Sequence, residues 1–479
     1  SDLDAAPSAA RSRFPGILDL NGELARADGA RVYRYLPQVI ARSARDYLRE
    51  AVPRAQVTQA RFRVRGDIYD LPFADARQGE FSVQAKVANA TYAYVPRSVQ
   101  GAGVKPWPAF TQLSADLVID RQSLQIKGAR GRVAGQPTLQ LMRADARIAD
   151  LAHAVVDVNG ELRGTVPEVL DVIRSTPVSG FTSQVLDRAI GNGAAEVKLA
   201  LSLPLDELDR TRVQGSVALS NAALQVTPDA PSLSRLRGSV NFSEGGFSLA
   251  GVQARMYGGD ARIEGGSRSV PASSTDAPIW FRAQGVASAE GLRQANELGF
   301  VARLAQRMQG STTYSASLGF RREVPEVSVT SNLQGLQVDL PAPLNKTADA
   351  ALPLRYENAL TRESLAPTAR RIEQLSVELG RLAAFTYLRD LEGAEPRVTR
   401  GSIAIGLEGA ETVPLAEQGV AANIRLGTVD ADAWERALSG ASGAPVTGEA
   451  ADTNAALAYL PNSLARSEEH TSELQSRFG

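Results

Sequence analysis

Cysteine is absent from this 479-residue chain, and histidine occurs only at His153 and His470. Without cysteine there are no disulfide bonds and no thiolate metal sites. His470 lies in a tail that we expect to be non-native, and His153 alone excludes a histidine-based metal cluster and disfavours a Ser-His-Asp triad. No P-loop, HExxH or GxSxG motif is present. The sequence therefore predicts no catalytic residues, no metal and no cofactor, and a protein that is not an enzyme.

The chain also has little net charge, few aromatic residues and no long apolar run. Lys and Arg total 52 against 53 Asp and Glu, and 6% of residues are aromatic. A nucleic-acid surface needs a basic stripe with interleaved aromatics, so no nucleic-acid partner is expected. No stretch approaches the roughly 18 apolar residues of a membrane-spanning helix. Because the chain begins without methionine or a signal peptide, we expect it to be part of a longer protein.

What the sequence does contain is strand alternation, organised around a block at Leu236–Gly258. Apolar residues two or four positions apart flank a Gly-rich turn, a pattern that predicts a β-hairpin. The same pattern occurs at Leu113–Gly135, at a constant offset of 123 residues. The two blocks share a closing glycine and matched apolar positions, as structural repeats do when only packing is retained.

Other stretches alternate apolar and polar residues with a period of two, which gives a strand one apolar and one polar face. The alternation predicts a sheet whose apolar face meets something other than water. The residues that we assign to this face are Phe62, Val64, Ile68, Phe81, Val83, Val87, Val197, Leu199, Leu201, Val217, Leu219, Val240, Phe242, Phe247 and Leu249.

Segments with helical spacing interrupt the strands. We predict helices over Gln38–Val52, Pro167–Arg174, Phe181–Ile190, Ala289–Met308 and Asp430–Leu438. Strands, hairpin block, strands and helix recur in that order, which predicts an array over residues 14–465 with approximate units 57–190, 191–308 and 309–465. Residues 1–13 are expected to form a loose N-terminal end. Residues 466–479 resemble a translated sequencing adapter and are expected to be non-native.

Three architectures can accommodate one-faced strands. A β-sandwich buries the apolar faces against each other, and on physical grounds alone it ranks first because sandwiches are common. A membrane barrel needs aromatic girdles and regular strands of about ten residues, which are missing here. An open, curved sheet would instead line a groove that keeps lipid acyl chains out of water. In that architecture the apolar residues assigned above are candidates for the lipid groove.

A family resemblance changes this ranking. Tyr33–Val52, Val57–Phe73, Leu333–Leu354 and Leu426–Trp434 resemble, in order, motifs of the YhdP-type branch of the AsmA-like family of Gram-negative bacteria. The resemblance covers about residues 14–460. It implies a mainly β fold, an elongated, curved antiparallel β-sheet groove with short inserted α-helices. It also implies a periplasmic protein anchored in the inner membrane by a segment outside this chain.

The resemblance further implies intermembrane phospholipid transport that supports outer-membrane biogenesis. Phospholipid acyl chains are then the expected partner, and contact with the inner and outer membranes is expected through parts outside this chain. An alternative of a different class is a periplasmic scaffold or chaperone that captures unfolded outer-membrane strands by edge pairing. An enzyme ranks third, because paired carboxylates such as Asp206 and Glu207 lie in a polar loop that nothing marks as a hydrolase site.

Overall fold

The computed structural model describes residues 17–35, 42–181, 186–228, 230–267, 278–322, 324–393, 395–406 and 414–425. Within these ranges the chain forms 22 strands joined by turns and short helices. The predicted fold class is confirmed: the protein is mainly β, with an open antiparallel sheet and short inserted helices. The chain divides into two compact units, unit 1 at Ser1–Ala254 and unit 2 at Arg255–Gly479, and each is described by itself.

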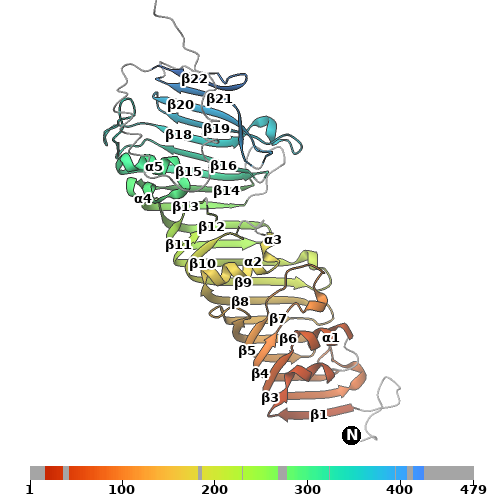
Figure 1. Ribbon diagram of the computed structural model, residues 1–479. Helices are drawn as coiled ribbons and strands as arrows, with labels where there is room; N and C mark the ends of the chain where they lie inside the picture. The colour runs from red at the N-terminus through yellow and green to blue at the C-terminus, as the bar shows by residue number, and fades with distance from the viewer. Residues whose placement is uncertain are drawn as a thin grey trace, which may run out of the picture. The chain divides into compact units, whose positions relative to one another are not determined.

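Unit 1 is a sheet of strands that follow one another in chain order (Figure 1). From β3 to β11 each strand pairs antiparallel with the next, and β1 pairs with the far edge of β3. The strands of this sheet therefore do not form the two facing layers of a sandwich. The strands are β1 (Ile17–Leu24), β2 (Ala27–Asp28), β3 (Arg54–Asp67), β4 (Gly79–Tyr92), β5 (Phe110–Asp120), β6 (Ser123–Val133), β7 (Gln140–Ile148), β8 (Val155–Thr165), β9 (Ile190–Pro204), β10 (Arg212–Gln225), β11 (Leu233–Ser243) and β12 (Gly246–Met256).

Both predicted hairpin blocks are hairpins with two-residue turns, β5–β6 and β11–β12. Their backbones also repeat at the offset of 123 residues. The φ angle is 52° at Gln112 and 50° at Arg235, and it is 60° at Gly128 and 61° at Gly251. In β5 and β6, and again in β11, the pairing register shifts beside these residues, as it does at a β-bulge. The repeat therefore preserves where the strands bend as well as how they pack. The three repeat units proposed above remain a prediction.

The two faces of the unit 1 sheet differ in chemistry. One face, here called the outer face, carries cross-strand ion pairs such as Arg61–Glu23 at 2.9 Å and Arg163–Glu196 at 2.7 Å. Exposed pairs of this kind each contribute less than about 1 kcal/mol to stability, but together their charges make this face hydrophilic. The opposite, inner face carries the apolar residues, in rows such as Val83, Ile119 and Leu124 that are directly paired from strand to strand. The predicted alternation is therefore confirmed.

The helices of unit 1 lie at one end of the strands. They are η1 (Gly29–Arg34), α1 (Arg42–Ala51), α2 (Val166–Ser175) and α3 (Val178–Phe181), with the single turn η3 (Arg97–Val99) at the same end and the single turns η2 (Ile68–Asp70) and η4 (Leu208–Arg210) at the opposite end. The predicted helices over Gln38–Val52 and Pro167–Arg174 correspond to α1 and α2. The helix predicted over Phe181–Ile190 is wrong in its described part, because α3 ends at Phe181 and Ile190 already belongs to β9.

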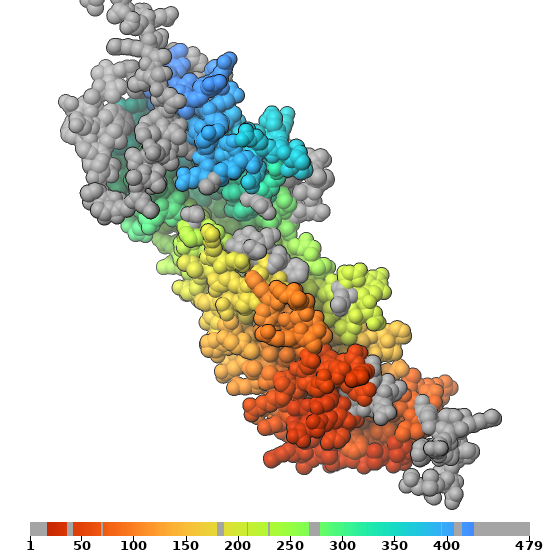
Figure 2. Space-filling view, turned by 45° about the vertical axis from the view of Figure 1, so that its right-hand side comes forward, coloured from red at the N-terminus to blue at the C-terminus, as the bar shows by residue number. Residues whose placement is uncertain are grey.

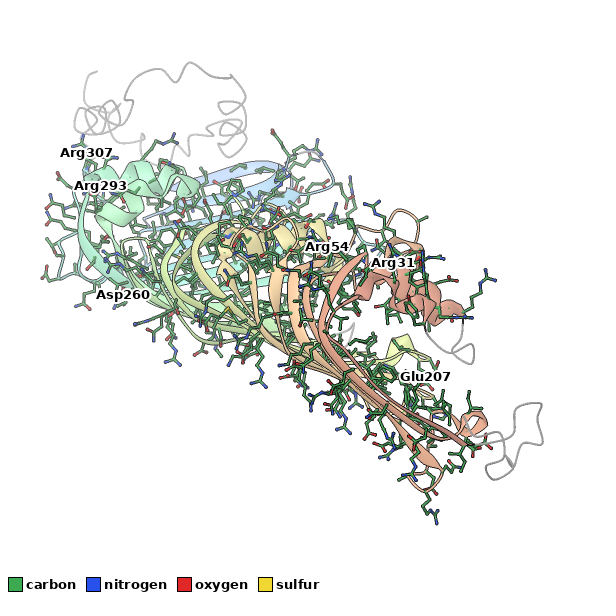
Figure 3. All side chains as sticks on the ribbon, turned by 90° about the horizontal axis from the view of Figure 1, so that it is seen from below. Arg31, Arg54, Glu207, Asp260, Arg293 and Arg307 are labelled. Atoms are coloured by element: carbon green, nitrogen blue, oxygen red, sulfur yellow. The ribbon has the colours of Figure 1, made fainter. Side chains whose placement is uncertain are left out.

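Two margins of the unit 1 sheet follow from this arrangement. The helix margin is the set of strand ends next to α1 and α2, for example Tyr92 of β4 and Ile190 of β9. The turn margin is the opposite set, which ends in the loops at 68–78, 121–122, 149–154, 205–211 and 244–245. Figure 3 shows the strands curving around the side on which α1 lies, with Arg31 and Arg54 near α1 and Glu207 on a turn-margin loop.

The strands of unit 2 also pair mainly antiparallel, but the connections between them are more irregular. Its strands pair antiparallel in the order β13-β14-β15-β16-β18-β19-β20-β21, β22 adds in parallel to β21, and β17 pairs with the start of β15. The strands are β13 (Gly259–Ser267), β14 (Ile279–Ser288), β15 (Met308–Arg321), β16 (Val324–Ser331), β17 (Leu336–Val338), β18 (Leu354–Leu360), β19 (Ile372–Leu379), β20 (Ala383–Asp390), β21 (Arg397–Ile405) and β22 (Gly419–Ile424).

The single helix predicted over Ala289–Met308 is broken into short pieces. They are α4 (Ala289–Gln294), η5 (Asn296–Leu298), α5 (Phe300–Leu304) and η6 (Ala305–Arg307). The break occurs at Gly299, whose φ of 51° is outside the helical range. The predicted helix over Asp430–Leu438, the loose end at 1–13 and the tail at 466–479 lie outside the described residues.

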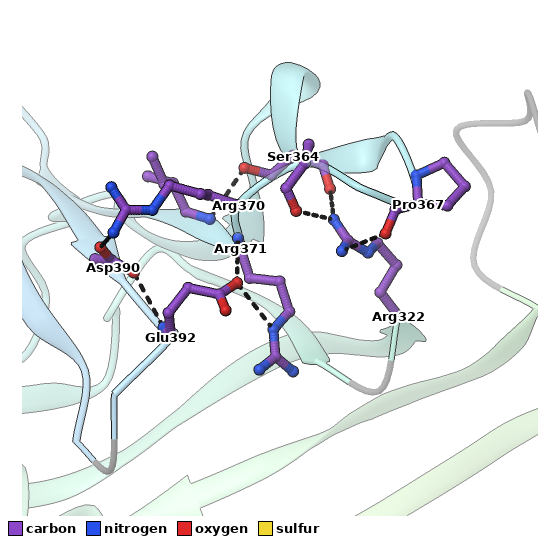
Figure 4. Close-up of polar contacts among 9 residues, drawn as sticks. Arg322, Ser364, Pro367, Arg370, Arg371, Asp390 and Glu392 are labelled. Carbon is purple, nitrogen blue, oxygen red and sulfur yellow. Dashed lines mark hydrogen bonds and ion pairs between the residues drawn. The ribbon is translucent and has the colours of Figure 1, made fainter.

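One end of unit 2 is closed by a polar loop that contains η7 (Arg362–Leu365). The guanidinium of Arg322 donates to the carbonyl oxygens of Ser364, Pro367 and Ala369 at 2.5, 2.9 and 3.0 Å (Figure 4). Beside it, the Arg371 backbone NH donates to Glu392 at 3.0 Å. These bonds fold the loop back over the strand ends, so this end of unit 2 differs from the short turns of unit 1.

Candidate functional site

The residues assigned to an apolar face all lie in unit 1, and 14 of the 15 lie in its strands. Ile68 is the exception: β3 ends at Asp67, and Ile68 is 51% exposed in the single turn η2. Its assignment to the strand face is therefore wrong, because the alternation was extended one residue past the end of the strand.

Cross-strand pairing places the assigned residues of β3 to β11 on one face. Phe62 pairs with Val83 and Val64 with Phe81 at one side of the sheet. Val197 pairs with Val217, and Val217 with Val240, further along it. The strands between these two groups continue the same rows. The inner face is thus continuous from β3 to β11.

Burial along this face changes in one direction. Toward the turn margin, the 14 assigned strand residues are all half-buried. Toward the helix margin, the inner residues of the same strands are buried: Ala60, Ala90, Ala195, Ala222, Leu236 and Val252. Each strand therefore has a covered part and an open part. We call the open part, which includes these 14 residues and their half-buried inner neighbours on β5 to β8, the open inner face.

Helix α1 covers the inner face of β3 and β4 at the helix margin. The hydroxyl of Tyr47 lies 3.0 Å from that of Tyr92, an inner residue of β4, and donates to the Tyr94 carbonyl at 3.0 Å. Ala51, at the end of α1, is fully buried and accepts a hydrogen bond from the Ala93 backbone NH at 2.8 Å. Burial raises the pKa of the Tyr47 and Tyr92 hydroxyls, so both stay neutral donors beneath the helix.

Helix α2 covers the inner face of β8 and β9 in the same way. A Cβ at Gly191, an inner position of β9, would meet Cγ1 of Val166 at 2.9 Å. Only glycine lets the helix approach the strand this closely. Val166 and Leu170 of α2 are buried, so apolar contact holds the helix over the sheet.

A buried carboxylate fixes the start of α2. Glu168 accepts hydrogen bonds from the backbone NH of Thr138 at 2.6 Å and of Thr165 at 3.1 Å, and from both threonine hydroxyls. Burial alone would raise the pKa of Glu168, but these hydrogen bonds outweigh it and lower the pKa to about 2. The bond to Thr165 forms a capping box, and the bonds to Thr138 join the helix to the β6–β7 connection.

Several residues of the open inner face were absent from the sequence-based assignment. They lie on the central strands β5 to β8: Leu117, Ile119, Leu124, Ile126, Val156 and Val158, all half-buried. Their period-two spacing is the same signal that identified the others. The bulges were not predicted, and they change which residues face inward: in β4 the inner residues are Val83 and Val87 before Asn89, but Ala90 and Tyr92 after it.

The inner face of unit 2 is less uniform. Phe281 and Leu318 form an apolar cross-strand pair, but Glu373 and Arg389 form a buried ion pair at 2.6 Å in the row beside Leu375 and Tyr387. Together with the loop held by Arg322, this pair interrupts the apolar surface. Apolar pairing nevertheless continues in unit 2, because Val329, Tyr356 and Val377 are half-buried and paired from strand to strand. The open inner face is defined here for unit 1 alone.

This arrangement offers a broad apolar surface and few directional groups. Among the described residues, no cluster of His, Cys, Asp and Glu is arranged to hold a metal ion. No helix of the described residues is long and apolar enough to cross a membrane. What the open inner face can do chemically is to bury apolar chains, at about 25 cal/mol per Å² of apolar surface removed from water.

Comparison with known proteins supplies a family. A search of curated proteins and a search of solved structures each give no match. The family model described as YhdP protein matches residues 2–475, which is nearly the whole chain. The match extends into residues 466–475, so it does not set the C-terminal tail apart. The motif resemblance and the open β-sheet agree with this match. The chain therefore belongs to the YhdP family.

Proposed function

We propose that this protein carries phospholipids between the inner and outer membranes along the open inner face, and so supports the lipid supply and barrier of the outer membrane. The observation that carries the proposal is the burial pattern of unit 1. A continuous apolar face stays half-exposed across β3 to β11, while the outer face of the same strands is polar and ion-paired. Acyl chains are the ligand that suits such a face.

The energetics favour a carrier that binds lipids without confining them to one position. Each methylene buried against the face contributes about 0.8 kcal/mol, so a chain is held by the sum of many small contacts. Neighbouring strands lie about 4.8 Å apart and present equivalent apolar side chains. A chain that slides from one strand to the next exchanges one apolar contact for another, so its free energy changes little.

Family membership supports a proposal about localisation. YhdP-type proteins are periplasmic and are anchored in the inner membrane, and we propose the same for the protein that contains this chain. The membranes would then be reached through parts of that protein outside the residues described above.

Lipid extraction tests the proposal directly. The chain is purified in mild detergent, and the lipid that accompanies it is quantified by mass spectrometry. More than one phospholipid per chain is expected, because the face offers several equivalent rows. A well-folded, monomeric protein without lipid would contradict the proposal, and co-purified polypeptide in place of lipid would favour a scaffold or chaperone function.

A further inference from the structure

The two margins of unit 1 offer very different surroundings to a bound lipid. At the helix margin, α1 and α2 lie over the inner face, and the inner residues Ala90, Ala195 and Leu236 are buried there. A lipid head group at this margin would have to displace a helix or lose its water. An ionised phosphate without compensating partners cannot leave water at an acceptable cost.

The turn margin is open between β5 and β10. Its connections are short, and two large apolar side chains stand exposed in them: Leu151 at 45% and Leu205 at 48%. Each has an aspartate beside it in the chain, Asp150 before Leu151 and Asp206 after Leu205. Apolar surface thus continues from the inner face to the edge of the sheet, where it meets water.

The turn margin is not open everywhere. At β3–β4 the loop at 68–78 folds back, and Phe73 is fully buried against Gly66 and Gly79. Cβ atoms at these glycines would meet the ring at 2.6 and 2.7 Å, so the ring closes this end of the margin. The open segment therefore begins beyond this loop.

We infer that a bound phospholipid lies with its chain ends toward the helix margin and its head group in water beyond the turn margin, between β5 and β10. This inference rests on the proposed function and specifies the path of the head group. The apolar part of the lipid then occupies the half-buried rows, where it gains burial. The phosphate stays solvated as the lipid moves from strand to strand, so no step requires a charge to cross the inner face.

Strand β9 offers a matched pair of test positions. Val197 is half-buried on the inner face of the strand, nearer the helix margin, and Leu205 follows the end of the strand at the turn margin and is 48% exposed. Substitution at exposed positions usually changes stability by less than about 0.5 kcal/mol, and Val197→Cys keeps an apolar side chain of similar size. The chain contains no cysteine, so Val197→Cys and Leu205→Cys each give one site for a fluorescent label, and Ala200→Cys on the outer face is the control.

The labelled full-length chains are loaded with phosphatidylcholine that carries a nitroxide quencher either on the head group or near the end of an acyl chain. We expect the head-group quencher to act several-fold more strongly at position 205 than at 197, and the chain-end quencher to show the opposite preference. Neither should quench the label at position 200. Circular dichroism confirms that the variants fold.

Each outcome is decisive because lipid binding is measured separately by mass spectrometry. Bound lipid with head-group quenching equal at the two positions, or stronger at 197, would overturn the inference and leave the proposed function standing. Absence of bound lipid from the unlabelled chain would overturn the proposed function and the inference with it. Quenching confined to position 205 by the head-group probe supports both.

Discussion

The ring of Phe242 on β11 lies against Gly215, its directly paired neighbour on β10. A Cβ at Gly215 would lie 2.8 Å from Cε2 of that ring and 2.6 Å from the carbonyl oxygen of Lys198. The same relationship links Gly22 to Phe62 in unit 1, and Gly265 to Phe281 and Gly401 to Tyr387 in unit 2. In each pair the aromatic ring fills the space above the glycine, so the inner face has neither a gap nor a protrusion there.

Gly215→Ala should therefore destabilise the protein by about 1–3 kcal/mol, since the added methyl group overpacks a site bounded by a ring and a backbone carbonyl. Urea unfolding of the full chain, monitored by circular dichroism, measures the change in the free energy of unfolding. Gly245→Ala is the matched control, because the nearest atom to a Cβ there is Ser243 Oγ at 3.6 Å. Equal stabilities of the two variants would contradict this account of the glycine.

A charge on the open inner face should abolish lipid binding more than it unfolds the chain. Leu201 is half-buried on the inner face of β9, and Ala200 beside it is exposed on the outer face. Leu201→Arg places a guanidinium where acyl chains are proposed to lie, and Val197→Asp does the same with a carboxylate. We expect several-fold less lipid in extracts of both variants, whereas Ala200→Arg should retain it.

Parallel unfolding curves separate the two effects of these substitutions. Because Leu201 is not fully buried, its replacement is expected to cost less than the 2–5 kcal/mol typical of truncation in a closed core. Loss of lipid and loss of fold in equal measure would contradict a binding role for the face.

The start of α2 should respond to acid. The pKa of Glu168 is lowered in the folded chain from 4.5 to about 2, so the hydrogen-bonded carboxylate stabilises the fold fully above about pH 4.5. This contribution, on the order of 3 kcal/mol, is lost as the pH falls from about 4.5 to 2. Glu168→Gln should remove that pH dependence and weaken the docking of α2.

Hydrogen exchange of residues 166–175 between pH 3 and 6 measures this effect. Exchange rates, corrected for their intrinsic pH dependence, should rise on acidification in the parent chain and be high throughout in Glu168→Gln. The exposed Glu161, 3.9 Å from Lys198, provides the control variant Glu161→Gln. If the acid response were unchanged in Glu168→Gln, its assignment to the Glu168 carboxylate would be refuted.

Charges at the turn margin should influence which lipids bind. The loop after β9 carries Asp206, Glu207 and Asp209, all exposed, with Arg210 paired to Glu207 at 2.6 Å. If head groups pass this loop, its excess negative charge repels anionic head groups. Neutralising the three carboxylates as Asn, Gln and Asn should raise the share of anionic over zwitterionic phospholipid recovered from the chain.

Salt and a matched variant check this prediction. The shift should shrink at high ionic strength, because exposed charges are screened. The same number of amide substitutions at Asp157, Glu161 and Glu196 on the outer face should leave the lipid composition unchanged. An identical shift in both variants would point to net charge alone rather than to a path along the turn margin.

The sequence by itself determined the one-sided chemistry of the sheet, because strand alternation is a local property that any stretch of chain displays. It also located both hairpins, α1, α2 and 14 of the 15 face residues, and its motifs pointed to the YhdP family. It failed at Ile68, where the strand ended one residue earlier than the pattern, and at Ala289–Met308, where helical spacing continued across the break at Gly299.

Only the tertiary structure decided which part of the inner face is open. The bulges beside Asn89 and Gly128 follow from the register between strands, and they reverse which residues face inward. The contact of Tyr47 in α1 with Tyr92 of β4, and the covering of Gly191 by α2, depend on segments distant in the chain. Periodicity depends only on neighbours along the chain. Whether a margin is covered or open depends instead on contacts with segments that are distant in the sequence.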